Sequence, residues 1–199
     1  MTNSIAIFCG SALGSDQIFS ETARQVGHTI AEQGKTLVYG GGRSGLMGIV
    51  ADSALEAGGQ VIGVIPHVLV DRELAHQGLT ELYVVKDMQE HKLKMSALSD
   101  GFIAMPGGAG TLEEIFEQWT WAQLGIHLKP NAFLNVNGFY DDLIKFLKMT
   151  TSKGFTHTRF TDSLIVSDSV KTILKQMDQF HAPEPKWGMV DPELLDVKA

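Results

Sequence analysis

The sequence predicts an α/β protein in which one parallel sheet carries helices on both faces. Short apolar runs, several of them ending at glycine or proline, alternate along the chain with segments of helical periodicity. A strand–helix–strand order at this spacing favours right-handed crossovers between parallel strands. The length of 199 residues suits one domain, so we expect a single-domain protein.

Short apolar runs with the composition of buried strands recur along the chain. Residues 5–9 illustrate the pattern, because Ile5 and Ile7 are β-branched and Gly10 ends the run. The same features predict further strands at residues 36–39, 60–65, 82–85, 102–105, 132–136 and 164–166.

Helical periodicity fills the intervals between these strands. Ile18, Val26 and Ile30 share one face of a helix over residues 16–33, and Ser15 is a candidate N-cap for it. The other predicted helices cover residues 45–57, 87–99, the segment from the glycine-rich run to 124, 139–151 and 170–180.

This alternation also sets the domain organisation. Residues 1–180 form the predicted Rossmann-like domain, in which residues 66–78 are an irregular, charged connection. Residues 181–199 hold three of the six prolines and show little periodicity. We therefore expect a C-terminal tail that crosses the surface or is disordered.

Charge and cysteine content disfavour several classes of partner. Sixteen Lys and Arg residues against 23 Asp and Glu residues give a net charge of −7, and the chain has no basic stripe for nucleic acid. The single cysteine, Cys9, cannot form an internal disulfide, which favours a cytoplasmic protein. Because no apolar run approaches the ~18 residues of a bilayer span, we expect no membrane partner.

Glycine is concentrated where three predicted strands end and helices begin, in residues 9–11, 40–45 and 106–111. Ligands of open parallel sheets bind beyond the carboxyl ends of the strands. A helix that starts there presents free N–H groups and a positive dipole end to an anion. We therefore expect a phosphate-bearing ligand. The candidate phosphate contacts in the first two segments are Ser11, Gly41, Gly42 and Gly45.

Known phosphate-binding motifs narrow the class of ligand. Gly40, Gly42 and Gly45 have the spacing of the dinucleotide fingerprint, which also requires an acidic residue at the end of the next strand. That strand ends at Ile65 and Pro66 without a carboxylate, so an NAD site is not expected. The chain also lacks a GxxxxGK[ST] P-loop and a Cys/His cluster with metal-ligand spacing. We expect no cofactor and no metal.

The segment from Thr111 to Glu114 has two interpretations. In a capping box, Thr111 caps the following helix and Glu114, three residues later, accepts from the Thr111 N–H. Alternatively, Glu114 points from a phosphate-binding helix start toward the sugar that carries the phosphate. The residues alone leave both interpretations open.

Residues 106–114, PGGAGTLEE, resemble the PGGxGTxxE signature of the Lonely Guy (LOG) family. Members of this family are cytokinin riboside 5′-monophosphate phosphoribohydrolases, and older descriptions call them "possible lysine decarboxylase". The resemblance covers residues 4–180. Further matching segments are residues 9–11, 40–48, 99–103 and 120–125.

This resemblance implies cleavage of the N-glycosidic bond of a nucleoside 5′-monophosphate, with release of the free base and ribose 5-phosphate. It identifies Glu114 as the catalytic carboxylate and places His91 where the family has a catalytic arginine. It also implies a homodimer, for which Trp119, Trp121 and Leu124 offer an apolar face. The substrate-binding residues that it implies are Glu73, Lys92, Gly108, Ala109, Gly110, Thr111, Leu112, Glu113 and Thr120.

The chemistry of these residue types is consistent with the implied reaction. Cleavage of a ribosyl bond builds positive charge on the sugar, and a carboxylate beneath that charge, such as Glu114, stabilises the transition state. Arginine offers a permanent, planar charged fork, whereas histidine is mostly neutral at pH 7. His91 therefore predicts a reduced rate or a changed substrate, unless it is a tolerated surface replacement. Ala109 also replaces a residue that is commonly aromatic in the family.

Two other functions remain open. A non-catalytic carrier of a nucleotide-like ligand, similar to the molybdenum-cofactor carrier proteins, would not need the missing arginine. An amino-acid decarboxylase would need a lysine that forms a Schiff base with pyridoxal phosphate. No lysine in the chain has a context that favours this chemistry.

Overall fold

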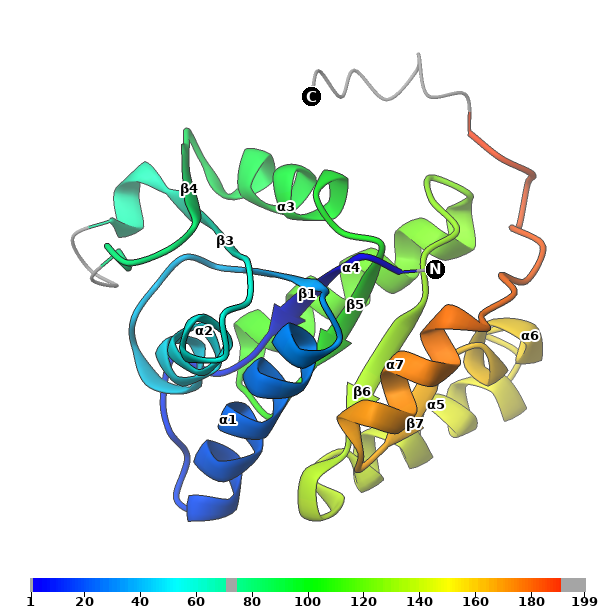
Figure 1. Cartoon of the computed structure of the whole chain (residues 1–199). Helices are drawn as coiled ribbons and strands as arrows, with labels where there is room; N and C mark the ends of the chain where they lie inside the picture. The colour runs from blue at the N-terminus through cyan, green and yellow to red at the C-terminus, as the bar shows by residue number, and fades with distance from the viewer. Residues whose placement is uncertain (1, 71–74, 191–199) are drawn as a thin grey trace.

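The computed structural model describes residues 2–70 and 75–190 and confirms the predicted α/β architecture. One parallel sheet has the strand order β4-β3-β2-β1-β5-β6-β7 (Figure 1). The chain adds strands outward from β1 to β4 and then crosses to β5 on the other side of β1. The direction in which strands are added therefore reverses between β1 and β5, while all strands stay parallel. The strands are β1 (Ser4–Phe8), β2 (Thr36–Tyr39), β3 (Val61–Pro66), β4 (Glu81–Val85), β5 (Gly101–Ala104), β6 (Asn131–Leu134) and β7 (Ile165–Ser167).

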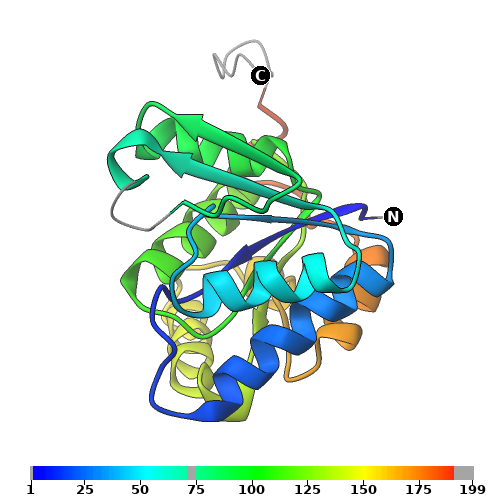
Figure 2. The same cartoon turned by 60° about the vertical axis from the view of Figure 1, so that its left-hand side comes forward.

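Helices cover both faces of the sheet, as Figures 1 and 2 show. The helices on one face are α1 (Gln17–Glu32), α2 (Gly45–Glu56) and α7 (Val170–Asp178). Those on the other face are α3 (Met88–Ala97), α4 (Ala109–Leu124), α5 (Asp141–Ser152) and α6 (Thr158–Asp162). Two short 3₁₀ helices, η1 (His67–Leu69) and η2 (Val136–Gly138), follow β3 and β6.

The core consists of two apolar layers, one on each face of the sheet. In β1, Ile5 and Ile7 belong to the layer beneath α1, α2 and α7, whereas Ala6 and Phe8 belong to the layer beneath the other helices. Because successive side chains of a strand point to opposite faces, a strand with two buried faces needs a continuous apolar run. This requirement explains why short apolar runs identified the strands.

A close contact between α1 and α2 fixes the direction in which α2 leaves the glycine-rich loop after β2. These helices lie side by side in Figure 2, in blue and cyan. A Cβ atom on Gly27 of α1 would collide with the carbonyl oxygen of Val50 on α2. Glycine is therefore needed at this crossing, which holds the start of α2 near the ends of the central strands.

Several helix boundaries differ from the predicted ones. The N-cap of α1 is Asp16, whose carboxylate accepts from the Ile18 N–H at 3.0 Å, so the prediction of Ser15 as the cap is wrong. The helix predicted over residues 139–151 is α5, which begins at Asp141 and follows η2, where Asn137 adopts a φ of 49°. The five-residue helix α6 was not predicted because it is too short to show periodicity.

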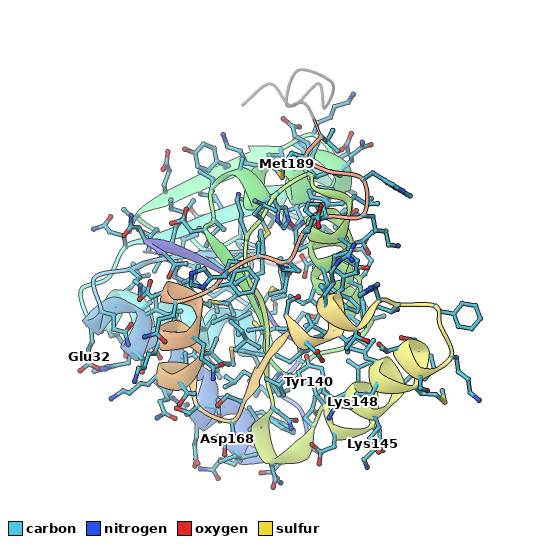
Figure 3. All side chains as sticks on the ribbon, turned by 90° about the vertical axis from the view of Figure 1, so that its right-hand side faces the viewer. Glu32, Tyr140, Lys145, Lys148, Asp168 and Met189 are labelled. Carbon is cyan, nitrogen blue, oxygen red and sulfur yellow. The ribbon has the colours of Figure 1, made fainter. Side chains whose placement is uncertain are left out.

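The second half of the chain packs around β6 and the end of α4. Tyr140, labelled in Figure 3, is buried, and its hydroxyl donates to the carbonyl of Met105 at 2.6 Å. Residues 181–190 run along the end of α4, where the Val190 N–H donates to the carbonyl of Gly125 at 3.1 Å. The remainder of the predicted tail lies outside the described residues.

Among those described, no helix combines the length and apolar character needed to cross a bilayer.

Trp119 belongs to the core and not to an exposed face. It is 6% exposed, and its indole N–H donates to the carbonyl of Phe160 at 3.2 Å. The prediction that Trp119 contributes to an exposed apolar surface is therefore wrong. Trp121 and Leu124, farther along α4, are partly exposed.

Candidate active site

A cavity of about 300 Å³ opens at the carboxyl ends of β1, β2, β3 and β5. This is the position at which open parallel sheets bind their ligands. Each of the three glycine-rich segments contributes to its wall. The lining residues are Cys9, Gly10, Ser11, Gly40, Met47, Pro66, Leu69, Met88, His91, Gly108, Ala109, Gly110, Thr111, Glu113 and Glu114.

The helix α4 begins at this cavity with no side chain capping its first N–H groups. Gly108 is its N-cap residue, and a Cβ atom on Gly108 or Gly110 would meet no other atom within 4 Å. At Gly107, in contrast, a Cβ atom would collide with the Thr111 side chain. The free N–H groups and the positive end of the helix dipole suit an anion such as a phosphate.

The capping-box interpretation of Thr111 and Glu114 is wrong. The helix α4 begins at Ala109, so Thr111 lies inside the first turn and does not precede the helix. The Glu114 carboxylate contacts the His91 ring instead. The helix starts early because Gly108 provides the extended N-cap conformation, with a φ of −97° and a ψ of −152°.

His91 and Glu114 bring α3 and α4 together at the cavity. The distance from His91 Nε2 to Glu114 Oε1 is 3.4 Å. His91 is 4% exposed, so its interpretation as a surface replacement is wrong. Its Nδ1 atom is buried and has no hydrogen-bond partner among the described residues. Buried polar atoms in proteins usually have a partner, so this unpaired nitrogen distinguishes His91 from an ordinary packing residue.

Lys92 connects the same two helices through its ammonium group. Its Nζ lies 2.6 Å from Glu113 Oε1 and 2.9 Å from Glu117 Oε1. Burial lowers the pKa of Lys92, but the hydrogen bonds and charges of the two carboxylates outweigh burial and raise it overall. Lys92 therefore stays charged, and it flanks the cavity without lining it.

Cys9 lines the cavity, but its thiol is poorly suited to act as a nucleophile. Burial, and to a smaller extent the charge of Glu114, raises the pKa of this thiol well above its ordinary range. Because the thiolate is the reactive form, Cys9 is expected to be inert at neutral pH.

Ser11 lines the cavity, whereas Gly41 and Gly45 occupy other positions in the fold. Gly41 has a φ of +75° and packs closely against Ile65. Gly45 has a φ of +57°, and a Cβ atom there would collide with the backbone of Ser11. Both glycines permit tight backbone conformations next to the cavity. Gly42 also lies outside the lining and pairs with Ala75 in an isolated bridge.

Of three other predicted site residues, two do not line the cavity and the third is not described. Leu112 is partly buried against the core beneath α3, α4 and α5. Thr120 is exposed on a later turn of α4. Glu73 lies outside the described residues. The roles of these residues in substrate binding stay predictions.

The apolar side of the cavity was not predicted from the sequence. It is formed by Met47, Pro66, Leu69 and Met88. The strand-end rule indicates Pro66, which ends β3. The two methionines and Leu69 have no sequence feature that distinguishes them from core residues.

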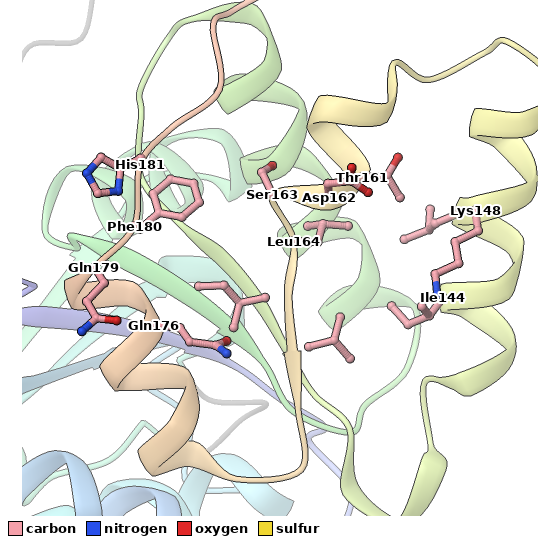
Figure 4. A pocket seen from close by; sticks show the side chains of 13 residues that line it. Ile144, Lys148, Thr161, Asp162, Ser163, Leu164, Gln176, Gln179, Phe180 and His181 are labelled. Carbon is pink, nitrogen blue, oxygen red and sulfur yellow. The ribbon is translucent and has the colours of Figure 1, made fainter.

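A larger groove of about 750 Å³ lies beside the edge strand β7 (Figure 4). Lys148 and Thr161 lie on one side of it and Gln176 and Gln179 on the other. None of the predicted site residues lines this groove. The larger of the two cavities is therefore not the one that the predicted site residues line.

Sequence similarity decides the family. A family model described as "Possible lysine decarboxylase" matches residues 47–177. A cytokinin riboside 5′-monophosphate phosphoribohydrolase of Arabidopsis thaliana is 42% identical over 176 residues, which are 88% of this chain and 82% of the relative. The enzyme LOG of Oryza sativa subsp. japonica is 41% identical over 186 residues, which are 94% of this chain and 76% of the relative. The chain belongs to the LOG family.

Solved structures with the same fold are more distant from this LOG-family chain in sequence. The molybdenum cofactor binding protein of Rippkaea orientalis has a TM-score of 0.67 at 19% identity and covers 90% of this chain and 97% of its own. The molybdenum cofactor carrier protein of Chlamydomonas reinhardtii has a TM-score of 0.66 at 21% identity, with 90% and 98% covered. At this identity, the similarity shows a common fold and nothing about the ligand.

Proposed function

We propose that the protein hydrolyses the N-glycosidic bond of purine nucleoside 5′-monophosphates, namely AMP or its N6-substituted cytokinin forms. The products are the free base and ribose 5-phosphate. One observation carries the proposal: Glu114 and His91 face each other in the cavity at which α4 begins with uncapped N–H groups. The activity named for the relatives supports the same reaction.

The start of α4 is the proposed phosphate site. Its N–H groups at Gly108, Ala109 and Gly110 border the cavity, and Ser11 contributes a hydroxyl from the loop after β1. A phosphate held there supplies binding energy remote from the bond that breaks, and this energy positions the ribose.

Glu114 lies within the first two turns of α4, close enough to the phosphate site to meet the attached ribose. As the bond between ribose and base breaks, the sugar gains oxocarbenium character. The Glu114 carboxylate stabilises this charge and orients the attacking water. Its carboxylate is shielded, with 18% of the side chain exposed, which strengthens its interaction with a developing charge.

His91 supplies an imidazole where other family members are expected to have a guanidinium. Its Nε2 faces Glu114, and its Nδ1 is buried without a partner among the described residues. A neutral imidazole offers one donor, so it fixes Glu114 and the substrate less strongly than arginine does. We expect the reaction to be slower for this reason.

A panel of nucleoside 5′-monophosphates incubated with the pure protein tests the proposal. The expected result is release of free adenine, or of the N6-substituted base, together with an equal amount of ribose 5-phosphate. AMP that binds but is never cleaved would favour the nucleotide-carrier alternative. An absorbance band from bound pyridoxal phosphate would favour the decarboxylase alternative.

The protein is proposed to act as a cytoplasmic homodimer, without nucleic acid or membrane partners. Trp187 and Met189 are 81% and 57% exposed on the segment that runs along the end of α4, near the partly exposed Trp121. Exposed apolar side chains of this size favour coverage by a second subunit. A monomeric mass in sedimentation at micromolar concentration would contradict the dimer.

A further inference from the structure

The connection between β3 and β4 forms one wall of the cavity. Pro66, at the end of β3, and Leu69, in η1, both line it. Apart from η1 and an isolated bridge at Ala75, its described residues form no regular element, so their path depends on specific contacts. Three of the described contacts that hold it involve one residue, His76.

The ring of His76 is buried and both of its nitrogens are used. His76 is 4% exposed. Its Nδ1 accepts from the N–H of Gly78 at 3.1 Å, and its Nε2 lies 2.8 Å from Oδ1 of Asp52 on α2. Because Nδ1 acts as an acceptor, the ring proton is on Nε2 and is donated to the Asp52 carboxylate.

Backbone contacts extend this attachment to the loop after β2. The His76 N–H donates to the carbonyl of Gly41 at 3.0 Å, and Ala75 pairs with Gly42 in an antiparallel bridge. Gly40, directly before these glycines, lines the cavity. The same contacts therefore connect two walls of the cavity, the loop after β2 and the connection after β3.

Asp52 is also connected to the cavity, through its helix. Asp52 lies on α2, the helix that also presents Met47 to the cavity. Its side chain is 42% exposed, so water can solvate the part of the carboxylate that His76 does not contact. A charged acceptor makes a stronger hydrogen bond than a neutral one and orients the buried ring.

We propose that Asp52 and His76 form a positioning pair that fixes the connection between β3 and β4 against α2 and so sets the apolar wall of the substrate cavity. The pair does not touch the reacting atoms. It acts through the Ala75 N–H, which donates to the carbonyl of Val70 beside Leu69 at 3.1 Å, and through the loop at Gly40. This role rests on the proposed function, because the wall then faces the ribose and base of a nucleotide whose phosphate lies at α4.

Asp52→Ala is the direct test, with Glu56→Ala as the matched control. Glu56 is exposed on the same helix and carries the same charge. We expect Asp52→Ala to raise KM for AMP about three- to tenfold and to change kcat less than about twofold, because the wall binds substrate while Glu114 stays in place. Asp52→Asn keeps an acceptor for His76 and should restore most of the wild-type KM. Glu56→Ala should have no effect.

A second measurement does not depend on activity. Asp52→Ala should accelerate amide hydrogen exchange in residues 75–80, whereas Glu56→Ala should not. His76→Asn can retain the local acceptor for the Gly78 N–H but cannot reach Asp52. The increases in KM caused by His76→Asn and by Asp52→Ala should therefore not multiply in the double variant.

The outcomes separate this role from the proposed function. No binding and no cleavage of AMP by the wild-type protein would contradict the proposed function. Wild-type cleavage together with unchanged KM and unchanged exchange in Asp52→Ala would overturn the positioning role alone. Equal effects of Asp52→Ala on kcat and KM, not rescued by Asp52→Asn, would also overturn it.

Discussion

The cavity at the glycine-rich loops and the groove beside β7 belong to the same sheet but are surrounded by different parts of the helices. The cavity faces the N-terminus of α4 and two apposed ionisable side chains, His91 and Glu114. The groove, although larger, is flanked by the last turns of α6 and α7, with Asp162 and Gln179 among its lining residues. Helix C-termini expose carbonyl groups and repel anions.

This difference shows that volume is a poor guide to the site in this molecule. An anionic substrate is attracted by free N–H groups and held where a carboxylate can act on it. Only the smaller cavity offers both.

The largest expected effect comes from Glu114→Gln, compared with Asp162→Asn in the groove. Glu114→Gln should lower kcat for AMP on the order of a hundredfold or more, because the amide cannot stabilise the charged sugar. Its melting temperature should stay close to that of the wild type, because Glu114 does not cap α4. Asp162→Asn should leave kcat unchanged. A similar loss in both variants would remove the distinction between the two regions.

His91→Arg separates the partner of Glu114 from the carboxylate itself. The variant should increase the rate of AMP cleavage at pH 7.5, because arginine keeps its charge and planar fork. His28→Arg, at an exposed position of α1, is the control and should leave the rate unchanged. An unchanged rate in His91→Arg would contradict a role for His91 beside Glu114.

Gly110→Ala tests the open space at the start of α4. Alanine favours the helix over glycine by about 0.5–1 kcal/mol, so stability should be maintained or increased. The added methyl group enters space that the structure leaves free. If phosphate binds there, KM for AMP should rise several-fold. An unchanged KM would place the phosphate elsewhere in the cavity.

The last prediction concerns stability and not activity, at His127, which lines neither region. Burial, followed by the charge of Lys129, lowers the pKa of His127 to about 3. Below the ordinary histidine pKa of about 6.5, the unfolded chain binds a proton that the folded chain rejects. The free energy of unfolding should therefore decrease as the pH falls from about 6.5, by up to about 1.4 kcal/mol per pH unit.

Urea unfolding between pH 5 and 7 measures this dependence. His127→Asn should show a shallower decrease than the wild type, because asparagine does not titrate. Identical slopes in the two proteins would mean that His127 becomes protonated in the folded state.

The strands were predictable because burial on both faces forces continuous apolar runs. Their order was not, since it depends on contacts between distant segments. The start of α4 was misjudged because Thr111 and Glu114 have the spacing of a capping box. The sequence does not reveal that the helix begins at Ala109, since its N-cap residue, Gly108, has no side chain that could mark the start.

Within the site, the sequence identified the polar residues better than the apolar ones. Glu114 and His91 are 23 positions apart, and the resemblance to the LOG family, not spacing, placed them together. Met47 and Met88 look like core residues in the sequence, and only the packing of α2 and α3 brings them to the cavity. The contact between Asp52 and His76 likewise joins residues that no local pattern connects.

Parallel assays of AMP and adenosine test the central claim most directly, because the two substrates differ only in the phosphate that α4 is proposed to hold. We predict release of adenine from AMP and no detectable release from adenosine at the same concentration, with ribose 5-phosphate as the second product. Equal rates on the two substrates would contradict the phosphate site at α4, and with it the reason for placing catalysis in the smaller cavity.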